Sequence, residues 1–208
     1  MKLKEISKLC KATGRVIMSD VRGMQWIGNS YASFPMLGMP ELDEKTVFTC
    51  LDYDEKTIEK MKVSSLSLAA FNLYDAYAAG DKELTSVILR FVHKGHTVDA
   101  WRTKEGDITF LDAAFTKPLI KDDDKTVLVL RETSEGVPYV IGKSGLFITA
   151  LIIPIVFHSV SGSTLAAALS MVTDRVQQQT MLAAIRTPED IENEETVEVD
   201  PDTGEVIE

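Results

Sequence analysis

The chain of 208 residues has few cysteines and no motif that fixes a reaction. Cys10 and Cys50 are far apart in the sequence and belong to no spaced pattern, so neither a disulfide scaffold nor a zinc site is predicted. Residues 1–14 have the period of an amphipathic helix and lack the continuous apolar run of a signal peptide. We therefore expect a reduced, cytoplasmic protein.

A complete phosphate-binding loop is also missing, although Gly142-Lys143-Ser144 matches part of one. Such a loop needs a glycine, four residues and then Gly-Lys-Ser/Thr before a helix. Here five residues separate Gly136 from Gly142, and the residues after Ser144 favour a strand. Residues 142–145 are therefore predicted as the turn of a β-hairpin.

The longest hydrophobic run is too short for a membrane span. Its strongly apolar part covers only residues 146–157, whereas a spanning helix needs roughly 20 mostly apolar residues. A buried strand, followed by an amphipathic helix at 161–186, explains the pattern better, and no membrane partner is expected. One face of that helix would pack on its own domain or bind a partner helix. This face carries Leu165, Leu169, Val172 and Val176.

Basic side chains are absent from residues 187–208, which hold ten acidic ones. The other 22 acidic side chains equal the 22 basic ones, so residues 1–186 are formally neutral. Because this tail has few bulky apolar residues, we expect it to be disordered. It would keep the protein in solution, dock on a partner, or compete with DNA for a basic surface. Its end, VDPDTGEVIE, resembles the ends of bacteriophage recombination and replication accessory proteins.

Residues 1–160 contain a repeated order of strands and helices, which follows a predicted N-terminal helix at 2–12. The first unit comprises a strand at 25–35, a helix at 42–62 and three strands between 64 and 103. Asp43 or Asp54 is a candidate cap for the helix of this unit.

The second unit repeats the order after residue 107. It comprises a short strand at 108–110, a short helix at 111–120 and three strands between 126 and 157. The predicted fold class is therefore α+β, with two β-α-β-β-β units that form an antiparallel sheet with helices on one face. A C-terminal helix and the disordered acidic tail complete the prediction.

This order of elements resembles one domain of the DNA sliding-clamp family, the β-subunit type of processivity factor. The likeness is greatest over residues 107–154 and extends across 20–157. ITFLDAAFTKPLIKDDDKTVLVLRE resembles the family's strand, short helix and following strand, and VPYVIGKSGLFITALIIPI resembles its closing hairpin. The resemblance implies a clamp-like fold in a phage or mobile-element protein without a catalytic centre, because clamps have none.

Clamp helices carry Lys and Arg side chains that track phosphates around a ring of several such domains. This chain has one such domain, so a ring would be a homo-oligomer. The candidate contacts to DNA or a partner are lysines of the two predicted helices. They are Lys45, Lys56, Lys60, Lys62, Lys117 and Lys121. A solvated face of mixed charge is the alternative, because six acidic residues share the first helix.

Other candidate chemistry is sparse. His93 and His96 flank a predicted tight turn, and three consecutive aspartates at 122–124 lie in a loop, so neither group has the ligands from several elements that a metal site needs. His158 has serine neighbours, but no orienting acid or oxyanion hole is predicted for it. We therefore expect no cofactor, no metal and no enzymatic activity.

Two functions fit these observations. The first is a non-enzymatic accessory protein of phage or mobile-element DNA metabolism, which holds partner proteins and has DNA as a further candidate partner. The second is an inhibitor of a host defence nuclease, of the anti-CRISPR kind, which acts by protein contact or by imitating DNA. Salt-dependent binding to duplex DNA distinguishes the two, because a DNA binder loses affinity steeply as salt rises.

Overall fold

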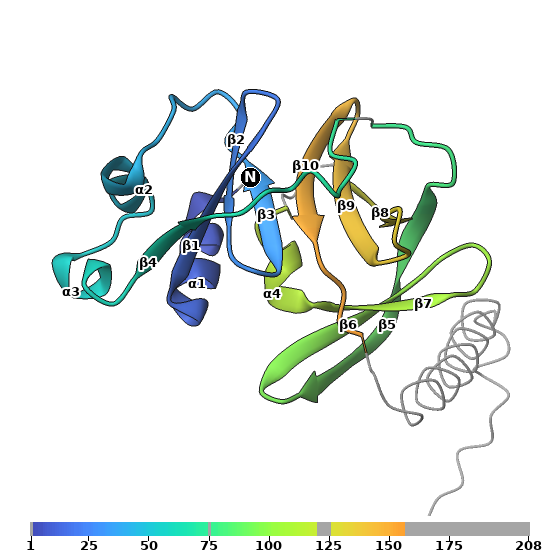
Figure 1. Cartoon of the computed structure of the whole chain (residues 1–208). Helices are drawn as coiled ribbons and strands as arrows, with labels where there is room; N and C mark the ends of the chain where they lie inside the picture. Colours follow the sequence, from blue (N-terminus) through green and yellow to red (C-terminus); the bar gives the residue numbers. More distant parts are fainter. Residues whose placement is uncertain (1, 75, 120–125, 157–208) are drawn as a thin grey trace, which may run out of the picture. The chain divides into compact units, whose positions relative to one another are not determined.

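A computed structural model describes residues 2–74, 76–119 and 126–156 (Figure 1). Its helices are α1 (Leu3–Thr13), α2 (Glu44–Cys50), α3 (Glu55–Ile58) and α4 (Ala113–Thr116). Its strands are β1 (Arg15–Val21), β2 (Met24–Gly28), β3 (Ala32–Pro35), β4 (Lys62–Ser65), β5 (Lys82–His93), β6 (His96–Arg102), β7 (Ile108–Asp112), β8 (Val127–Glu132), β9 (Pro138–Ser144) and β10 (Phe147–Ile152). Within these ranges, no helix is long and apolar enough to cross a membrane.

The strands form a ten-stranded sheet in the order β4-β1-β2-β3-β10-β9-β8-β5-β6-β7. The fold is α+β, as predicted, but the sheet is mixed, because β4 runs parallel to β1. The prediction of an antiparallel sheet was wrong at this edge. A parallel pair needs a long crossover connection, and the chain between β1 and β4 includes α2 and α3.

The two faces of the sheet bury different sets of side chains, because successive residues of a strand point to opposite faces. On β9, Val140 packs in one cluster with Ile6 of α1 and Phe115 of α4. Its neighbours Tyr139 and Ile141 pack in a second cluster on the other face. α1 and α4 both contribute side chains to the first cluster, and Figure 1 shows where the two helices lie.

The predicted strand at 25–35 is a hairpin in the structure. Its turn is fixed by Asn29, whose side-chain oxygen accepts hydrogen bonds from the backbone N–H groups of Tyr31 and Ala32, each at 2.9 Å. Gly28 is required beside this turn, because a Cβ atom there would lie 1.9 Å from the Ala32 carbonyl oxygen. One predicted strand thus becomes β2 and β3.

The predicted helix at 42–62 consists of two short helices. Both capping predictions are confirmed: Asp43 accepts hydrogen bonds from the N–H groups of Lys45 and Thr46, and Asp54 accepts one from Thr57. Between the helices, Asp52 has a φ of 55°, a left-handed conformation that a continuous helix does not contain. The chain therefore turns there and starts again at Asp54.

Residues 66–74 and 76–81 follow β4, and Leu68, Phe71 and Leu73 among them pack on the face of the sheet opposite α1 and α4. The predicted strand at 64–75 was wrong for most of its length, because β4 ends at Ser65. Leu68 and Leu73 instead insert into the second cluster beside Tyr139. The Tyr139 hydroxyl accepts a hydrogen bond from the Asn72 N–H at 3.1 Å, so this irregular segment is fixed to β9 by apolar and polar contacts together.

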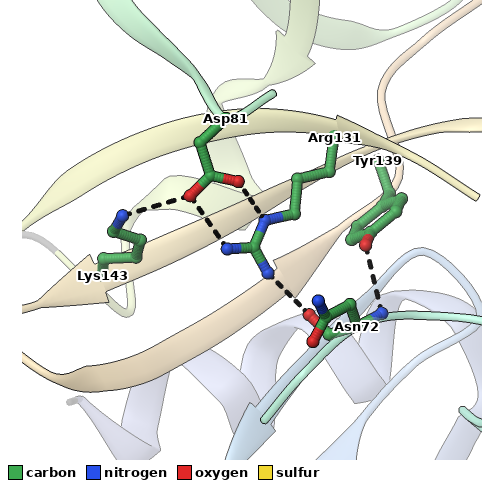
Figure 2. A network of polar contacts seen from close by, with 5 residues as sticks. All are labelled: Asn72, Asp81, Arg131, Tyr139 and Lys143. Atoms are coloured by element: carbon green, nitrogen blue, oxygen red, sulfur yellow. Dashed lines mark hydrogen bonds and ion pairs between the residues drawn. The ribbon is translucent and has the colours of Figure 1, made fainter. Parts of the chain in front are cut away.

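A buried ion network holds the end of the same segment, as Figure 2 shows. The Arg131 side chain, 5% exposed, binds Asp81 through two hydrogen bonds of 2.6 and 2.9 Å and donates a third, of 2.8 Å, to the Asn72 carbonyl. Lys143 lies 3.3 Å from the same Asp81 carboxylate. Lys143, the lysine of the partial phosphate-loop match, is thus part of an internal ion network.

The predicted hairpin near residue 145 is confirmed by the antiparallel pairing of β9 with β10. Its turn is shorter than predicted and comprises Gly145 and Leu146, because Ser144 already pairs with Phe147. Gly142 lies within β9. A Cβ atom on Gly142 would approach Leu119 to 3.1 Å, so its small size allows the segment after α4 to pack closely on the strand.

Several predicted features lie outside the described residues. They are the helix at 161–186 with Leu165, Leu169, Val172 and Val176, the acidic tail at 187–208, and Lys121.

Candidate nucleic-acid interface

The N-terminal helix α1 has two chemically distinct faces. Ile6, Leu9 and Cys10 are buried in the core. Lys4, Lys8 and Lys11 are exposed, and their spacing of four and three residues aligns them along the opposite face. We call these three lysines the basic helix face. Burial of the apolar side therefore fixes the direction in which the three charges point.

Polar groups beneath α1 hold the helix in place without adding charge. The Ser7 hydroxyl donates to the Leu51 carbonyl, and the Tyr53 hydroxyl donates to the Ser7 carbonyl, both at 2.8 Å. Burial raises the pKa of Cys10 to about 12 and is the main cause that raises the pKa of Tyr53 to about 12. Both side chains are therefore neutral at pH 7, and the charges of α1 lie on its outer side.

The basic helix face is partly neutralised by Glu5, which pairs with Lys8, and by Asp54, whose lowered pKa is due mainly to hydrogen bonds from Thr57 and in smaller part to the charge of Lys11. Lys8 lies 2.7 Å from Glu5, and its hydrogen bond is the main cause that lowers the pKa of that carboxyl group. Lys11 lies over the ring of Tyr53, 4.8 Å from its centroid, a contact that preserves the positive charge. An anion that approaches α1 therefore meets an excess of positive charge.

α4 continues this surface at the N-terminal end of α1. The Lys2 N–H donates to the Pro118 carbonyl at 3.0 Å, which joins the two helices. Lys117, next to Pro118, is exposed, and its positive charge contributes to the lowered pKa of Glu5. Since α1 has 11 residues, it is about 16 Å long, roughly the axial length of five base pairs of DNA.

The other predicted lysines are distributed differently. Lys60 is exposed and lies near Gly14, the residue that ends α1. A Cβ atom added to Gly14 would lie 3.9 Å from the carbonyl oxygen of Lys60. Lys62 starts β4 one residue before Val63, which packs against the helix-side cluster, so the Lys62 side chain points to the other face of the sheet. Lys45 and Lys56 are exposed on α2 and α3, next to acidic residues of the same helices.

Among the predicted lysines that the structure describes, Lys60 and Lys117 thus lie next to the basic helix face. The lysines of α1 itself were not among the predicted contacts, because the clamp resemblance implied contacts from the helices predicted at 42–62 and 111–120. The sequence nevertheless indicates this face, because lysines at positions 4, 8 and 11 are interspersed with apolar residues at 6, 9 and 10. A helical wheel of residues 2–12 would have identified them.

A histidine–carboxylate pair lies near α4. His96 Nδ1 is 2.7 Å from Asp112 Oδ2, and Asp112 also caps α4 by accepting a hydrogen bond from the Ala114 N–H. Within the described part of the chain, no serine, threonine or cysteine side chain hydrogen-bonds to His96. We interpret it as a link between β6 and α4.

Comparisons with protein-family models, with curated proteins and with solved structures found no match for this chain. The geometry of α1 and its surroundings is therefore the basis for the functional argument.

Proposed function

We propose that this protein is a non-enzymatic accessory factor of phage or mobile-element DNA metabolism, which contacts duplex DNA through the basic helix face. The observation that carries the proposal is the exposure of Lys4, Lys8 and Lys11 on one side of a helix whose other side is buried. Lys117 and Lys60 extend the positive charge beyond the two ends of α1.

Physical chemistry supports phosphate as the ligand of this face. Each lysine that neutralises a phosphate releases condensed counterions, and this release drives sequence-independent binding. Lysine on a flexible stem contacts phosphate as a point charge and needs no fixed geometry. α1 is short and straight, so it would touch one side of a duplex, and binding through α1 alone would be weak.

The clamp resemblance supplies a way to strengthen such contacts. In a clamp, helices on one face of each sheet line a hole that surrounds DNA, and α1 and α4 share one face here. We propose that several copies assemble, so that the basic faces of many α1 helices act on one duplex.

Titration of a fluorescent 30-base-pair duplex at several salt concentrations tests this proposal. The triple variant Lys4→Gln, Lys8→Gln, Lys11→Gln should lower the slope of log affinity against log salt by about 3, or about 0.9 for each lost phosphate contact. The full-length wild type should bind most tightly at low salt.

A matched triple variant controls for net charge. Lys45→Gln, Lys94→Gln and Lys104→Gln remove the same charge from exposed positions outside α1 and α4, so the salt slope should stay near the wild-type value. Equal slopes for the two triple variants would contradict the assignment of DNA contact to α1. A wild type that does not bind DNA at low salt would overturn the proposed function.

The high density of acidic side chains in the tail favours a second candidate function. Ten acidic side chains and no basic ones in residues 187–208 match the charge pattern of a DNA mimic. In this alternative, the protein inhibits a host defence nuclease by occupying its basic channel and does not bind DNA. Capture of a basic nuclease together with absence of DNA binding would favour it.

A further inference from the structure

A broad cleft lies between β1, β2 and β4 and the segment that leads into α2. Its volume is about 870 Å³, within the range of ligand-binding pockets. Four of the chain's eight methionines line it. They are Met18, Met24, Met36 and Met39.

Met18 and Met36, which both pack with the helix-side cluster, give the cleft an adaptable apolar floor, whereas Met24 packs with the second cluster on the other face of the sheet. Met36 is only 3% exposed and Met39 is 37% exposed, so the apolar lining extends from the core to the surface. Methionine has three rotatable bonds and a polarizable sulfur, and it is common on surfaces that accept partners of varied shape. Ser19 also lines the cleft, and its buried hydroxyl has no hydrogen-bond partner within the described ranges.

Carboxylates are the only charged side chains among the residues that line the cleft. They belong to Asp20, Glu41, Asp43 and Glu44, and all four residues are exposed. Hydrogen bonds from Thr46 and Lys45 lower the pKa of Asp43, so its carboxylate is ionised at neutral pH. Among the described residues, no Lys, Arg or His lines this cleft. An occupant must therefore combine apolar bulk with positive charge.

We propose that this cleft binds a basic amphipathic helix of a partner protein, with bulky apolar side chains on the methionines and Lys or Arg side chains against the carboxylates. A helix is favoured because Met18, Met36 and Val63 lie on the same face of the sheet within a broad cleft, which suits the apolar stripe of a helix. The chain's own residues 187–208 are excluded by charge, since they are acidic. This proposal concerns a different surface from α1 and does not depend on DNA binding.

The test uses a short synthetic Leu/Lys peptide that is patterned as an amphipathic helix, with the full-length protein. Methyl-labelled methionine NMR should show that Met18, Met36 and Met39 shift on peptide addition, while Met61, outside the cleft, does not. A matched peptide with Glu in place of Lys should cause no shifts. Shifts confined to other methionines, or equal effects of the two peptides, would overturn the assignment.

Variants separate the two parts of the site. Glu41→Gln with Glu44→Gln should weaken peptide binding about five- to tenfold at low salt, because each exposed ion pair contributes modestly, and the difference should shrink at high salt. The control Glu132→Gln with Glu135→Gln removes exposed acids outside the cleft and should leave the affinity unchanged. Equal weakening by the two double variants would contradict a specific acidic rim.

Met39→Ser tests the apolar part. Met39 is partly exposed, so the variant should fold, and its loss of affinity should persist at high salt, since apolar packing is not screened. Unchanged affinity would contradict the role of the methionine floor. Concentration-dependent methionine shifts without any peptide would identify a second copy of the chain as the occupant instead and would overturn the proposed partner.

Discussion

Two groups of basic side chains in this molecule have opposite surroundings. Arg131 and Lys143 lie beneath residues 66–81, where their side chains are 5% and 11% exposed and share the Asp81 carboxylate. Lys4, Lys8 and Lys11 lie on the outer side of α1 and are exposed. The first group closes the fold on itself, whereas the second is available to an external anion.

The comparison shows that burial and pairing, more than residue type, determine what a basic side chain can do. A buried cation must be paired and hydrogen-bonded, because its desolvation costs several kcal/mol. An exposed lysine contributes little to stability when it pairs on the surface. Substitutions in the two groups should therefore have separable effects, on stability in one and on DNA affinity in the other.

The largest effect is expected from Asp81→Asn. This change leaves Arg131 and Lys143 in a mostly buried site without the carboxylate that neutralises them. The free energy of unfolding should fall by about 3 kcal/mol, measured by urea denaturation. The DNA affinity of the folded variant should equal that of the wild type, since the basic helix face is unchanged.

The surface pair of Lys82 and Asp107 provides the control for this prediction. Their side chains are 42% and 59% exposed and lie 3.2 Å apart. Asp107→Asn should leave the urea midpoint close to the wild-type value, because water screens the pair. A comparable loss of stability in both variants would remove the distinction between buried and exposed basic groups.

A second prediction concerns acid. Burial raises the pKa of Asp81, but Arg131 and Lys143 outweigh it and lower the pKa below its ordinary value. When a carboxyl group has a lower pKa in the folded state, it stabilises the fold at pH values above its unfolded-state pKa of about 3.9. This stabilisation is lost as the pH falls through the folded-state pKa. Wild-type stability should therefore decline below about pH 4 more steeply than that of Asp81→Asn, measured by urea denaturation across pH. Parallel pH profiles would contradict the coupling.

Local sequence patterns predicted the elements that depend on neighbouring residues. The N-terminal helix, the caps Asp43 and Asp54, and the hairpin of β9 and β10 follow from periodicity and turn chemistry within short windows. The turn at Asn29 and the left-handed Asp52 were missed, because a single polar residue inside an apolar or helical pattern carries a weak signal.

Long-range features could not be predicted from such local patterns. The parallel pairing of β4 with β1 joins residues that are 47 apart, as in Arg15 and Lys62, and nothing local encodes it. The network of Asp81, Arg131 and Lys143 likewise depends on three separate segments. The basic helix face was present in the sequence, but recognising it as a site required knowing that Ile6, Leu9 and Cys10 face the core.

A third prediction concerns the effect of the acidic tail on DNA binding by the exposed lysines. Deletion of residues 187–208 removes ten negative charges and leaves a formally neutral chain, so affinity for duplex DNA should increase several-fold at low salt through reduced repulsion. The increase should vanish toward about 1 M salt, where the screening length is about 3 Å. Urea stability should not change. A loss of DNA affinity on deletion would show that the tail contributes to binding.

The smallest expected effects come from single lysines at the edge of the basic helix face. Lys117 lies beside the start of α1, whereas the Lys62 side chain points to the opposite face of the sheet. Lys117→Gln should lower the salt slope of DNA binding by about 1, and Lys62→Gln should leave it unchanged. Both positions are exposed, so neither change should alter stability, and the same titration measures both. If Lys62→Gln had the larger effect, DNA would contact the other face of the sheet, and the basic helix face would be a solvated surface.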